Sequence, residues 1–397
     1  MRILVVATKL PWPPVDGGRL VLWRTLVALA DAGHEIELVA CSPHDASAGV
    51  GAAPLPMGSR VALHAVIVDK PNPLAVAIHS LFSGTPLTIA RHQYGQVRQR
   101  VAACLREFVP DVVHAEQLQA LANCVDARRL NIPVVLRMQN VESELWRQTA
   151  GQGWRTRIAA VEAFRLRRYE TRAIRDCSLT LALTAADAGR LRSHLEPDEA
   201  SRVRHVAPPF PSTLPVADAL TGEPCIVLSG SAGWQPNTLG TRWFLDRVWP
   251  SIGRELPLAR LHVFGGESGA AEDVCWHAAP TDSASAFPAN SIVVVPLSVA
   301  SGIRMRILEA WARGLPVVAT TVAASGLEVS DGRELLIADD ANAFVTAIRR
   351  LCRERNLRDQ LVKAGRDYLH RQHDPERAAH ALTDAYREAI DRGSSAS

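Results

Sequence analysis

The sequence predicts an α/β protein of two doubly wound domains, each a parallel sheet covered by helices on both faces. Three observations support this. Short aliphatic runs alternate with stretches of helical spacing along most of the chain, as in repeated strand–helix–strand units. The alternation stops after residue 208 and restarts at residue 225. A length of 397 residues suits two domains better than one.

The first strand–helix–strand unit occupies the first forty residues. Residues 3–7 form a continuous aliphatic run, which is typical of a parallel strand buried on both faces. Residues 9–18 are rich in proline and glycine and are predicted to form a loop. Apolar residues then recur at helical spacing up to Gly33, and residues 35–40 are predicted to form the second strand.

Further short strands and one long helix complete the first domain. Strands are predicted over residues 111–114, 133–136 and 179–183. Residues 145–176 have the spacing of a long helix, and the stretch 147–175 carries eight arginines and two glutamates. A solvated helix face accounts for this charge. A basic face resting on anionic lipid is the second interpretation.

The same alternation returns in the second half of the chain. Strands are predicted over residues 226–228, 261–264, 292–295 and 316–319, and helices over 237–255, 302–313 and from 341 onward. We assign residues 1–208 to an N-terminal domain, 209–224 to a linker, 225–375 to a C-terminal domain, and 376–397 to a helix that packs back on the N-terminal domain, with a disordered tail.

Composition excludes several classes of function. The net charge of +3 is too small for a protein whose main partner is nucleic acid. The seven cysteines are scattered without a CxxC pair, which disfavours both a disulfide framework and a zinc site. No apolar run approaches the roughly 20 residues of a membrane span. We expect a cytoplasmic protein, with peripheral contact at the inner face of the membrane as the further option.

The most informative segment covers residues 291–321. It reads as a strand, a loop of small residues at 300–302, a helix and another strand. Such a loop lets the phosphates of a ligand approach the backbone, and the first amides of the helix can donate to the anion. Arg304 and Arg306 add cationic charge beside it.

Glu309 lies within the predicted helix of this segment. By itself it reads equally well as a surface carboxylate on an amphipathic helix. Its apolar neighbours shift that balance, because a buried carboxylate needs a partner. Two ribose hydroxyls of a nucleotide would serve as that partner.

The pair Glu309-Ala310 with the later run Gly314-Leu-Pro-Val-Val resembles the donor-binding signature of glycosyltransferase family four. That family comprises retaining GT-B enzymes that use nucleotide-sugars. The resemblance implies two Rossmann-like domains facing each other across a cleft. It also implies that Glu309 holds the ribose and that the amides of residues 303–305 face the diphosphate.

Four other segments are similar to a bacterial branch of the family involved in exopolysaccharide assembly. Co-linear matches of this kind are stronger evidence than any single short motif. The segments cover residues 11–19, 140–144, 168–170 and 233–237.

Three positions depart from the family pattern. Ser301 stands where a glutamate usually contacts the sugar, and Gln139 stands where a histidine commonly lines the reaction centre. The segment 229–236 lacks the basic pair that the family has after the first strand of its second domain. Gln139 can hydrogen-bond a sugar hydroxyl but cannot act as a general base near neutral pH.

We therefore expect a retaining hexosyltransferase that needs no metal and no cofactor. Its donor would be a UDP- or GDP-sugar and its acceptor a glycan or a lipid-linked glycan. The alternative is a catalytically weak or inactive GT-B protein that binds a nucleotide-sugar or glycan in an assembly complex. The predicted catalytic residues are Gln139 and Arg304, and the predicted donor-binding residues are Gly17, Gly18, Gly265, Gly266, Ser301, Gly302, Ile303, Arg304, Met305 and Glu309.

Overall fold

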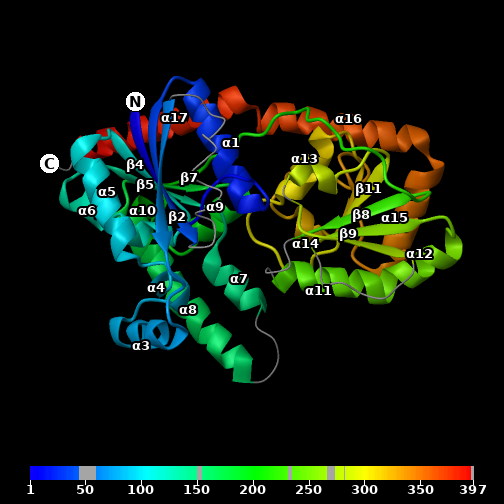
Figure 1. The fold of residues 1–397 in the computed structure, drawn as a ribbon, viewed down its shortest axis with the longest axis horizontal. Helices are drawn as coiled ribbons and strands as arrows, with labels where there is room; N and C mark the ends of the chain where they lie inside the picture. The colour runs from blue at the N-terminus through cyan, green and yellow to red at the C-terminus, as the bar shows by residue number, and fades with distance from the viewer. Residues whose placement is uncertain (44–59, 150–153, 231–234, 266–272, 281, 395–397) are drawn as a thin grey trace. The chain divides into compact units, whose positions relative to one another are not determined.

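The fold is known from a computed structural model of the chain. The structure describes residues 1–43, 60–149, 154–230, 235–265, 273–280 and 282–394. The chain divides into two compact units (Figure 1). The first unit comprises Met1–Trp12, Leu22–Pro209 and Pro375–Ser397, and the second comprises Pro13–Val21 and Phe210–Asp374.

The first unit is built on a seven-stranded parallel sheet with the order β3-β2-β1-β4-β5-β6-β7. The strand order reverses between β1 and β4, and ligands of open α/β sheets bind beyond the carboxyl ends of strands at such a point. The strands are β1 (Arg2–Ala7), β2 (Glu35–Pro43), β3 (Val61–Val68), β4 (Val112–Glu116), β5 (Val134–Met138), β6 (Leu179–Ala182) and β7 (Val203–His205).

Helices cover both faces of this sheet, because its strands are apolar on both sides. Ile3 and Val5 of β1 pack in one core with α1 and α17. Leu4 and Val6 point to the opposite core, which includes α5 and α8. The helices of this unit are α1 (Gly17–Asp31, which belongs to this unit from Leu22 onward), α3 (Pro73–Ser83), α4 (Leu87–Ala90), α5 (Gly95–Glu107), α6 (Val125–Arg129), α7 (Glu142–Thr149), α8 (Trp154–Asp176), α9 (Ala185–Arg192), α10 (Pro197–Ala200) and α17 (Pro375–Ser394), with a 3-10 turn η3 (Ala120–Asn123).

The prediction of a single long helix over residues 145–176 is wrong. The described residues form two helices, α7 and α8, which pack against each other. Residues 150–153 between them lie outside the described residues. The helical spacing of apolar residues persists in both helices, so the pattern alone did not distinguish one helix from two.

The second unit contains a six-stranded parallel sheet with the order β10-β9-β8-β11-β12-β13. Its order reverses between β8 and β11. The strands are β8 (Cys225–Ser229), β9 (Arg260–Phe264), β10 (Val274–His277), β11 (Ser291–Val295), β12 (Val317–Ala319) and β13 (Leu336–Ile337). The helices are α11 (Gln235–Trp243), α12 (Trp249–Glu255), α13 (Met305–Ala312), α14 (Thr321–Ala324), α15 (Ala341–Arg353) and α16 (Arg355–Gln372), with a π-helical turn η4 (Phe244–Val248) and a 3-10 turn η5 (Ser283–Ala286).

Helix α13 begins three residues later than predicted. Gly302 has a φ of 73°, which an α-helix does not contain, so the helix cannot start there. Arg304 occupies the N-cap position and Met305 is the first helical residue. Ile303 therefore belongs to the loop and not to the first turn of the helix.

Part of the predicted linker lies along the second unit. The Phe210 amide donates to the His373 carbonyl at 2.7 Å, and the Leu214 amide donates to the Ala312 carbonyl at 2.9 Å. The division between the units falls at Pro209, just before these contacts. Among the helices that the structure describes, none has both the length and the apolar character required to cross a bilayer.

Candidate functional site

The carboxyl edge of the second sheet, where β8 and β11 end, is the candidate donor site. The chain passes from β11 through residues 296–304 into α13, and from β8 toward α11. Gly265 follows β9 with a φ of 73°, and a Cβ there would lie 2.6 Å from the Gly230 carbonyl oxygen. This edge therefore requires glycine at position 265. Gly266, also predicted for the site, lies outside the described residues.

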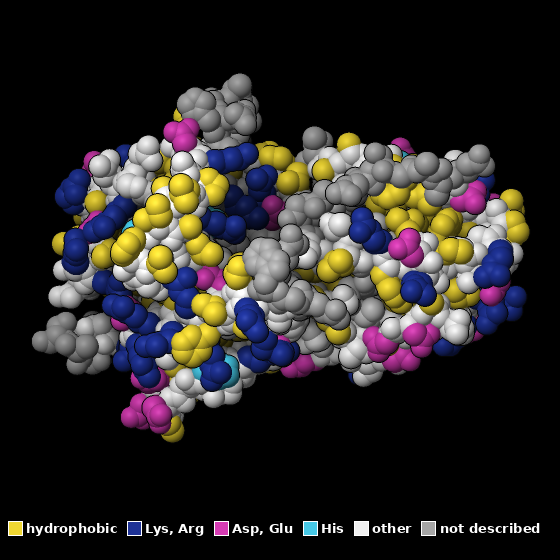
Figure 2. Space-filling view, turned by 90° about the horizontal axis from the view of Figure 1, so that it is seen from below, with side chains coloured by type: hydrophobic (Ala, Val, Ile, Leu, Met, Phe, Trp, Pro, Cys, Tyr) yellow, Lys and Arg dark blue, Asp and Glu magenta, His cyan; other side chains and the backbone are white. Residues whose placement is uncertain are grey.

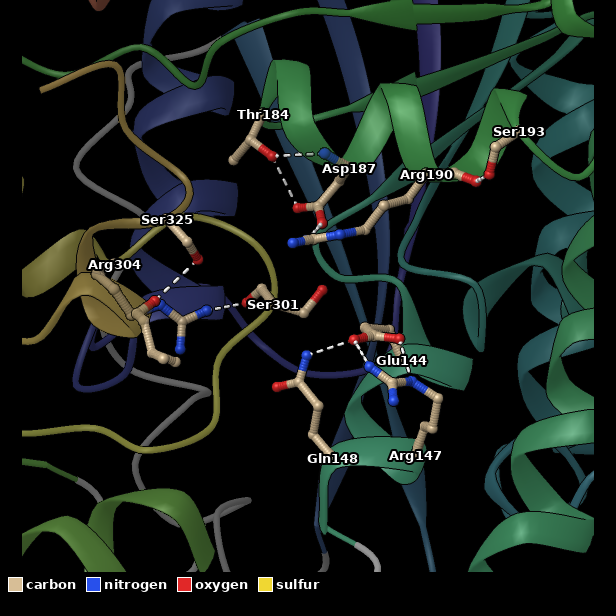
Figure 3. Close-up of polar contacts among 11 residues, drawn as sticks. Glu144, Arg147, Gln148, Thr184, Asp187, Arg190, Ser193, Ser301, Arg304 and Ser325 are labelled. Carbon is tan, nitrogen blue, oxygen red and sulfur yellow. Dashed lines mark hydrogen bonds and ion pairs between the residues drawn. The ribbon is translucent and has the colours of Figure 1, made fainter.

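A hydrogen bond from an arginine side chain to the backbone holds the loop before α13. Arg304 donates from Nη2 to the carbonyl oxygen of Ser301 (Figure 3). An N-cap is usually Ser, Thr, Asp or Asn, whose oxygen accepts from the first amides of the helix. Here the N-cap residue is a cation, placed at the helix end that already carries positive dipole charge. The side chains of Ile303 and Met305 are buried, so only their backbone can serve a ligand.

Arg306, on the first turn of α13, adds a second guanidinium to this place. Desolvation first, and then the charge of Arg304, lower its pKa to about 9. Its Nη2 donates to Oδ1 of Asn237 on α11 at 2.8 Å. Among the described residues no carboxylate forms an ion pair with Arg306. An anion bound at this point would relieve the cost of burying that charge.

Glu309 is buried, but it has protein partners that the sequence analysis did not foresee. Its Oε1 accepts from the Ser283 hydroxyl at 2.6 Å and from Nη2 of Arg313 at 2.7 Å. The carboxylate therefore does not depend on a ligand for a partner, since a salt bridge on the same helix satisfies its charge, and the contact with ribose hydroxyls stays a prediction. All the contacts described for Glu309 end on Oε1. The position remains compatible with a hydroxyl ligand on Oε2.

In the first unit, Gln139 is held by its neighbours at the carboxyl end of β5. Its Oε1 accepts from Nε2 of Gln117 at 2.8 Å, and its Nε2 donates to Oε1 of Glu116 at 2.8 Å. Gln117 in turn accepts from the Thr8 hydroxyl at 2.7 Å. These residues follow β1, β4 and β5, so the chain of amides spans the point where the strand order reverses. Gln139 is thus a fixed amide, with no titratable group.

A buried ion pair supports this chain of amides. Burial by itself would raise the pKa of Glu116, but the charge of Arg137 and the contact with His114 outweigh it and hold the pKa at about 2. His114 lies 3.0 Å from Glu116 through Nε2 and 2.6 Å from the Tyr386 hydroxyl through Nδ1. Both ring nitrogens of this buried histidine therefore contact protein groups. The arrangement gives His114 a structural role.

Gly17 and Gly18 are the first two residues of helix α1, so the helix begins two residues earlier than predicted and the two glycines do not belong to the loop before it. Asp16 precedes them and accepts from the Arg19 amide at 2.9 Å, so a protein carboxylate already caps this helix. The Arg19 side chain lies 3.4 Å from the same carboxylate. A Cβ on Gly17 would lie 3.5 Å from Cγ of Met305, the first residue of α13. Gly17 thus lies near the start of α13, while the Arg19 amide of α1 is already occupied by Asp16.

Three residues of the site were not predicted from the sequence. Asn237 stands at the end of a segment that resembled the family, but nothing indicated that it binds Arg306. Arg313 is four residues after Glu309, which is the usual spacing of an ion pair on a helix. Ser283 has no sequence signal, because it reaches Glu309 from a turn 26 residues away.

Comparison with known proteins found a family similarity within the second unit. Residues 223–354 match the protein family described as glycosyl transferases group 1. An uncharacterized 44.6 kDa protein in the cps region of Klebsiella pneumoniae is 21% identical over 372 residues, covering 87% of this chain and 90% of that protein. The lipopolysaccharide core biosynthesis glycosyltransferase LpsE of Rhizobium meliloti is 38% identical over 82 residues, 20% of this chain and 23% of that protein.

Solved structures bear on the fold of the whole chain. The Anabaena protein HepE, crystallised with UDP-glucose, superposes with a TM-score of 0.63 at 13% identity, covering 97% of this chain and 98% of that one. Together with the two parallel sheets, this confirms the predicted GT-B fold of the α/β class. The group 1 match covers residues 223–354, within the second unit, and LpsE is named as a glycosyltransferase, so the comparisons support glycosyl transfer as the chemistry of a chain with this fold.

Proposed function

We propose that the chain is a metal-independent, retaining hexosyltransferase that takes its sugar from UDP or GDP at the start of α13. The observation that carries this proposal is Arg306. Its half-buried guanidinium lies beside Arg304, and desolvation together with the charge of Arg304 lowers its pKa to about 9. Two neighbouring cations at the positive end of a helix favour a bound dianion such as a nucleoside diphosphate.

The charges of Arg304 and Arg306 also suit the cleavage of the bond between sugar and diphosphate. When the bond between sugar and diphosphate breaks, negative charge develops on the departing phosphate oxygen. Fixed cations and amides at that oxygen stabilise the transition state, and such stabilisation is usually the largest catalytic contribution. Arg304 and Arg306 can supply it without a metal ion.

Gln139 is consistent with retention of configuration. An amide cannot remove a proton from the acceptor hydroxyl near neutral pH. In a front-face mechanism the departing phosphate oxygen takes that proton itself while the acceptor oxygen forms the new bond to the sugar. Gln139, oriented by Gln117 and Glu116, would then only position a sugar hydroxyl.

The related proteins suggest the substrates. HepE was crystallised with UDP-glucose, which favours a uridine donor. LpsE is named for lipopolysaccharide core biosynthesis, and the Klebsiella relative is encoded in a cps region. We infer an acceptor that is a glycan or a lipid-linked glycan of the cell surface, and peripheral contact with an anionic membrane.

One observation favours the alternative, a protein that binds a nucleotide-sugar without turning it over. Both heavy atoms of the Gln139 amide are engaged by protein groups, and no titratable base stands in that position. Such a protein would bind the nucleotide-sugar with the same affinity but would not cleave the nucleotide from the sugar. Turnover therefore decides between the two.

The test measures the affinity for UDP and GDP by calorimetry, and nucleotide release from their sugars in the presence of EDTA. We expect micromolar-range binding of one of the two, slow release without acceptor, and no loss of release with EDTA. Arg306→Gln should weaken the affinity at least tenfold, about 1.4 kcal/mol, because one cation facing the diphosphate is removed.

Arg242→Gln on α11 is the matched control, since Arg242 is an exposed arginine of the same unit. It should bind like the wild type. Equal affinity of the Arg306 variant and the wild type would remove this helix end from the donor site. Binding without any release would favour the non-catalytic alternative, and release that requires added magnesium or manganese would refute the metal-free mechanism.

A further inference from the structure

Helix α3 turns its apolar side chains outward. Helices on the surface of a globular protein bury an apolar stripe and expose their polar residues. In α3 the buried side chain is that of Ser80, a hydroxyl residue. The exposed side chains, between 49% and 85% accessible, recur at the spacing of one helical face: Leu74, Ile78, Leu81 and Phe82.

This exposed face is fixed in place by helix α8. Arg165 of α8 donates from Nη2 to the carbonyl oxygens of Ser80 at 2.6 Å and Thr85 at 2.9 Å. A cation at the carboxyl end of a helix also compensates the negative end of its dipole. Asn72 caps the other end by accepting from the Leu74 amide at 2.9 Å. Helix α3 is therefore a well-anchored element and not a frayed one.

Exposed apolar side chains continue onto the neighbouring turns of α8. Together with those of α3 they form what we call the apolar face of the first unit. Figure 2 shows hydrophobic side chains interspersed with lysines and arginines on this side of the unit. The members contributed by α8 are Ile158, Val161 and Phe164.

The exposed charges of residues 70–92 and of α8 before Asp176 are cationic. Residues 70–92 contain no aspartate or glutamate. The two carboxylates of α8 before Asp176, Glu162 and Glu170, are both buried. Exposed arginines remain on that helix, and the Arg168 guanidinium lies 5.8 Å above the Phe164 ring. The face thus combines apolar side chains with cations that no exposed carboxylate of these segments neutralises.

We propose that the apolar face docks on the surface of a bilayer that contains anionic lipid, with Leu81 and Phe82 entering the headgroup region. Apolar side chains together with lysine and arginine are the combination that holds interfacial helices on anionic membranes. A second copy of the chain fits less well, because pairing two such faces would bring arginine against arginine. The inference rests on the proposed function in one respect: the membrane contact would give the enzyme access to a lipid-linked acceptor.

Co-sedimentation of the full chain with vesicles tests the proposal. Vesicles of phosphatidylcholine alone are compared with vesicles that contain one-third phosphatidylglycerol. We expect binding to the anionic vesicles at least fivefold stronger, and weakened by added salt. The double variant Leu81→Ser/Phe82→Ser should lower the partition coefficient at least tenfold, and Phe164→Ser should lower it in the same direction.

Leu258→Ser is the matched control, since Leu258 is also a largely exposed leucine and lies in the second unit. It should bind vesicles like the wild type. All variants should keep the thermal midpoint and the nucleotide affinity of the wild type, so a failure here is distinguishable from failure of the donor site. The proposal is overturned if the wild type stays in the supernatant, binds neutral vesicles equally, or is affected as strongly by Leu258→Ser.

Discussion

At the scale of single residues, Glu309 shows where inference from the sequence holds and where it ends. Its burial could be predicted from the apolar residues around it, and the structure confirms that burial. The partner could not be predicted. Arg313 at i+4 was visible in the sequence as an ordinary helix pair, but whether a pair is buried depends on what packs over the helix.

Glu170 on α8 provides a prediction about pH. Burial raises its pKa to about 7, although the Ser143 amide and hydroxyl both donate to the carboxylate. A carboxyl whose folded-state pKa is raised stabilises the fold below its unfolded pKa, and this stabilisation is lost as the pH rises through 7. The free energy of unfolding should therefore fall by up to about 3 kcal/mol between pH 5 and pH 8 from this residue.

Glu170→Gln should remove that part of the pH dependence, because the amide keeps an acceptor for Ser143 and does not ionise. Urea denaturation at pH 5 and pH 8 measures the difference between the variant and the wild type. Glu354→Gln, at an exposed carboxylate, serves as the control and should follow the wild type. A Glu170 variant with the same loss of stability from pH 5 to pH 8 as the wild type would contradict the prediction.

At the scale of elements, the sequence located strands better than helix ends. Aliphatic runs predicted the central strands of both sheets, because a parallel strand that is buried on both faces consists mostly of aliphatic residues. The start of α13 was misplaced, since the pattern of apolar residues continues through Gly302 while the backbone there has a φ of 73°. A positive φ of this kind depends on the conformation of the loop, which cannot be predicted from the spacing of apolar residues.

The loop before α13 can be tested by matched glycines of the second unit. Gly302 and Gly332 both have positive φ, 73° and 75°, so alanine at either should cost about 1 kcal/mol of stability. If the backbone at Gly302 shapes the donor site, only Gly302→Ala should also weaken nucleotide binding, by tenfold or more.

Thermal denaturation and calorimetry with UDP or GDP give the two quantities. Gly332 is the control because no atom lies within 4 Å of the Cβ that alanine would add there. Equal nucleotide affinity in the two variants would mean that the loop conformation at Gly302 is a matter of folding alone.

At the scale of the whole molecule, the alternation of strands and helices was sufficient to predict two parallel sheets and the fold class. The strand order within each sheet was not predicted, because pairing between distant strands leaves no local signal. The boundary between the units was placed near residue 208 from composition. The contacts of Phe210 and Leu214 with the second unit come from packing that composition does not encode.

Helix α17 follows the second unit in the chain but contributes to the core of the first. Leu382 is fully buried there beside β1 and β2, while Leu361 of α16 is fully buried in the core of the second unit. Truncation of a buried leucine to alanine costs about 2–5 kcal/mol. We therefore predict that Leu382→Ala destabilises the first unit and Leu361→Ala the second.

Hydrogen exchange followed peptide by peptide separates these effects, which a single melting temperature would merge. Leu382→Ala should accelerate exchange in β4 and β5 and leave β8 and β11 unchanged, because α17 packs against the former strands. Leu361→Ala should produce the reverse pattern. Equal acceleration in both sheets by either variant would show that the chain opens as one cooperative body and would contradict the prediction.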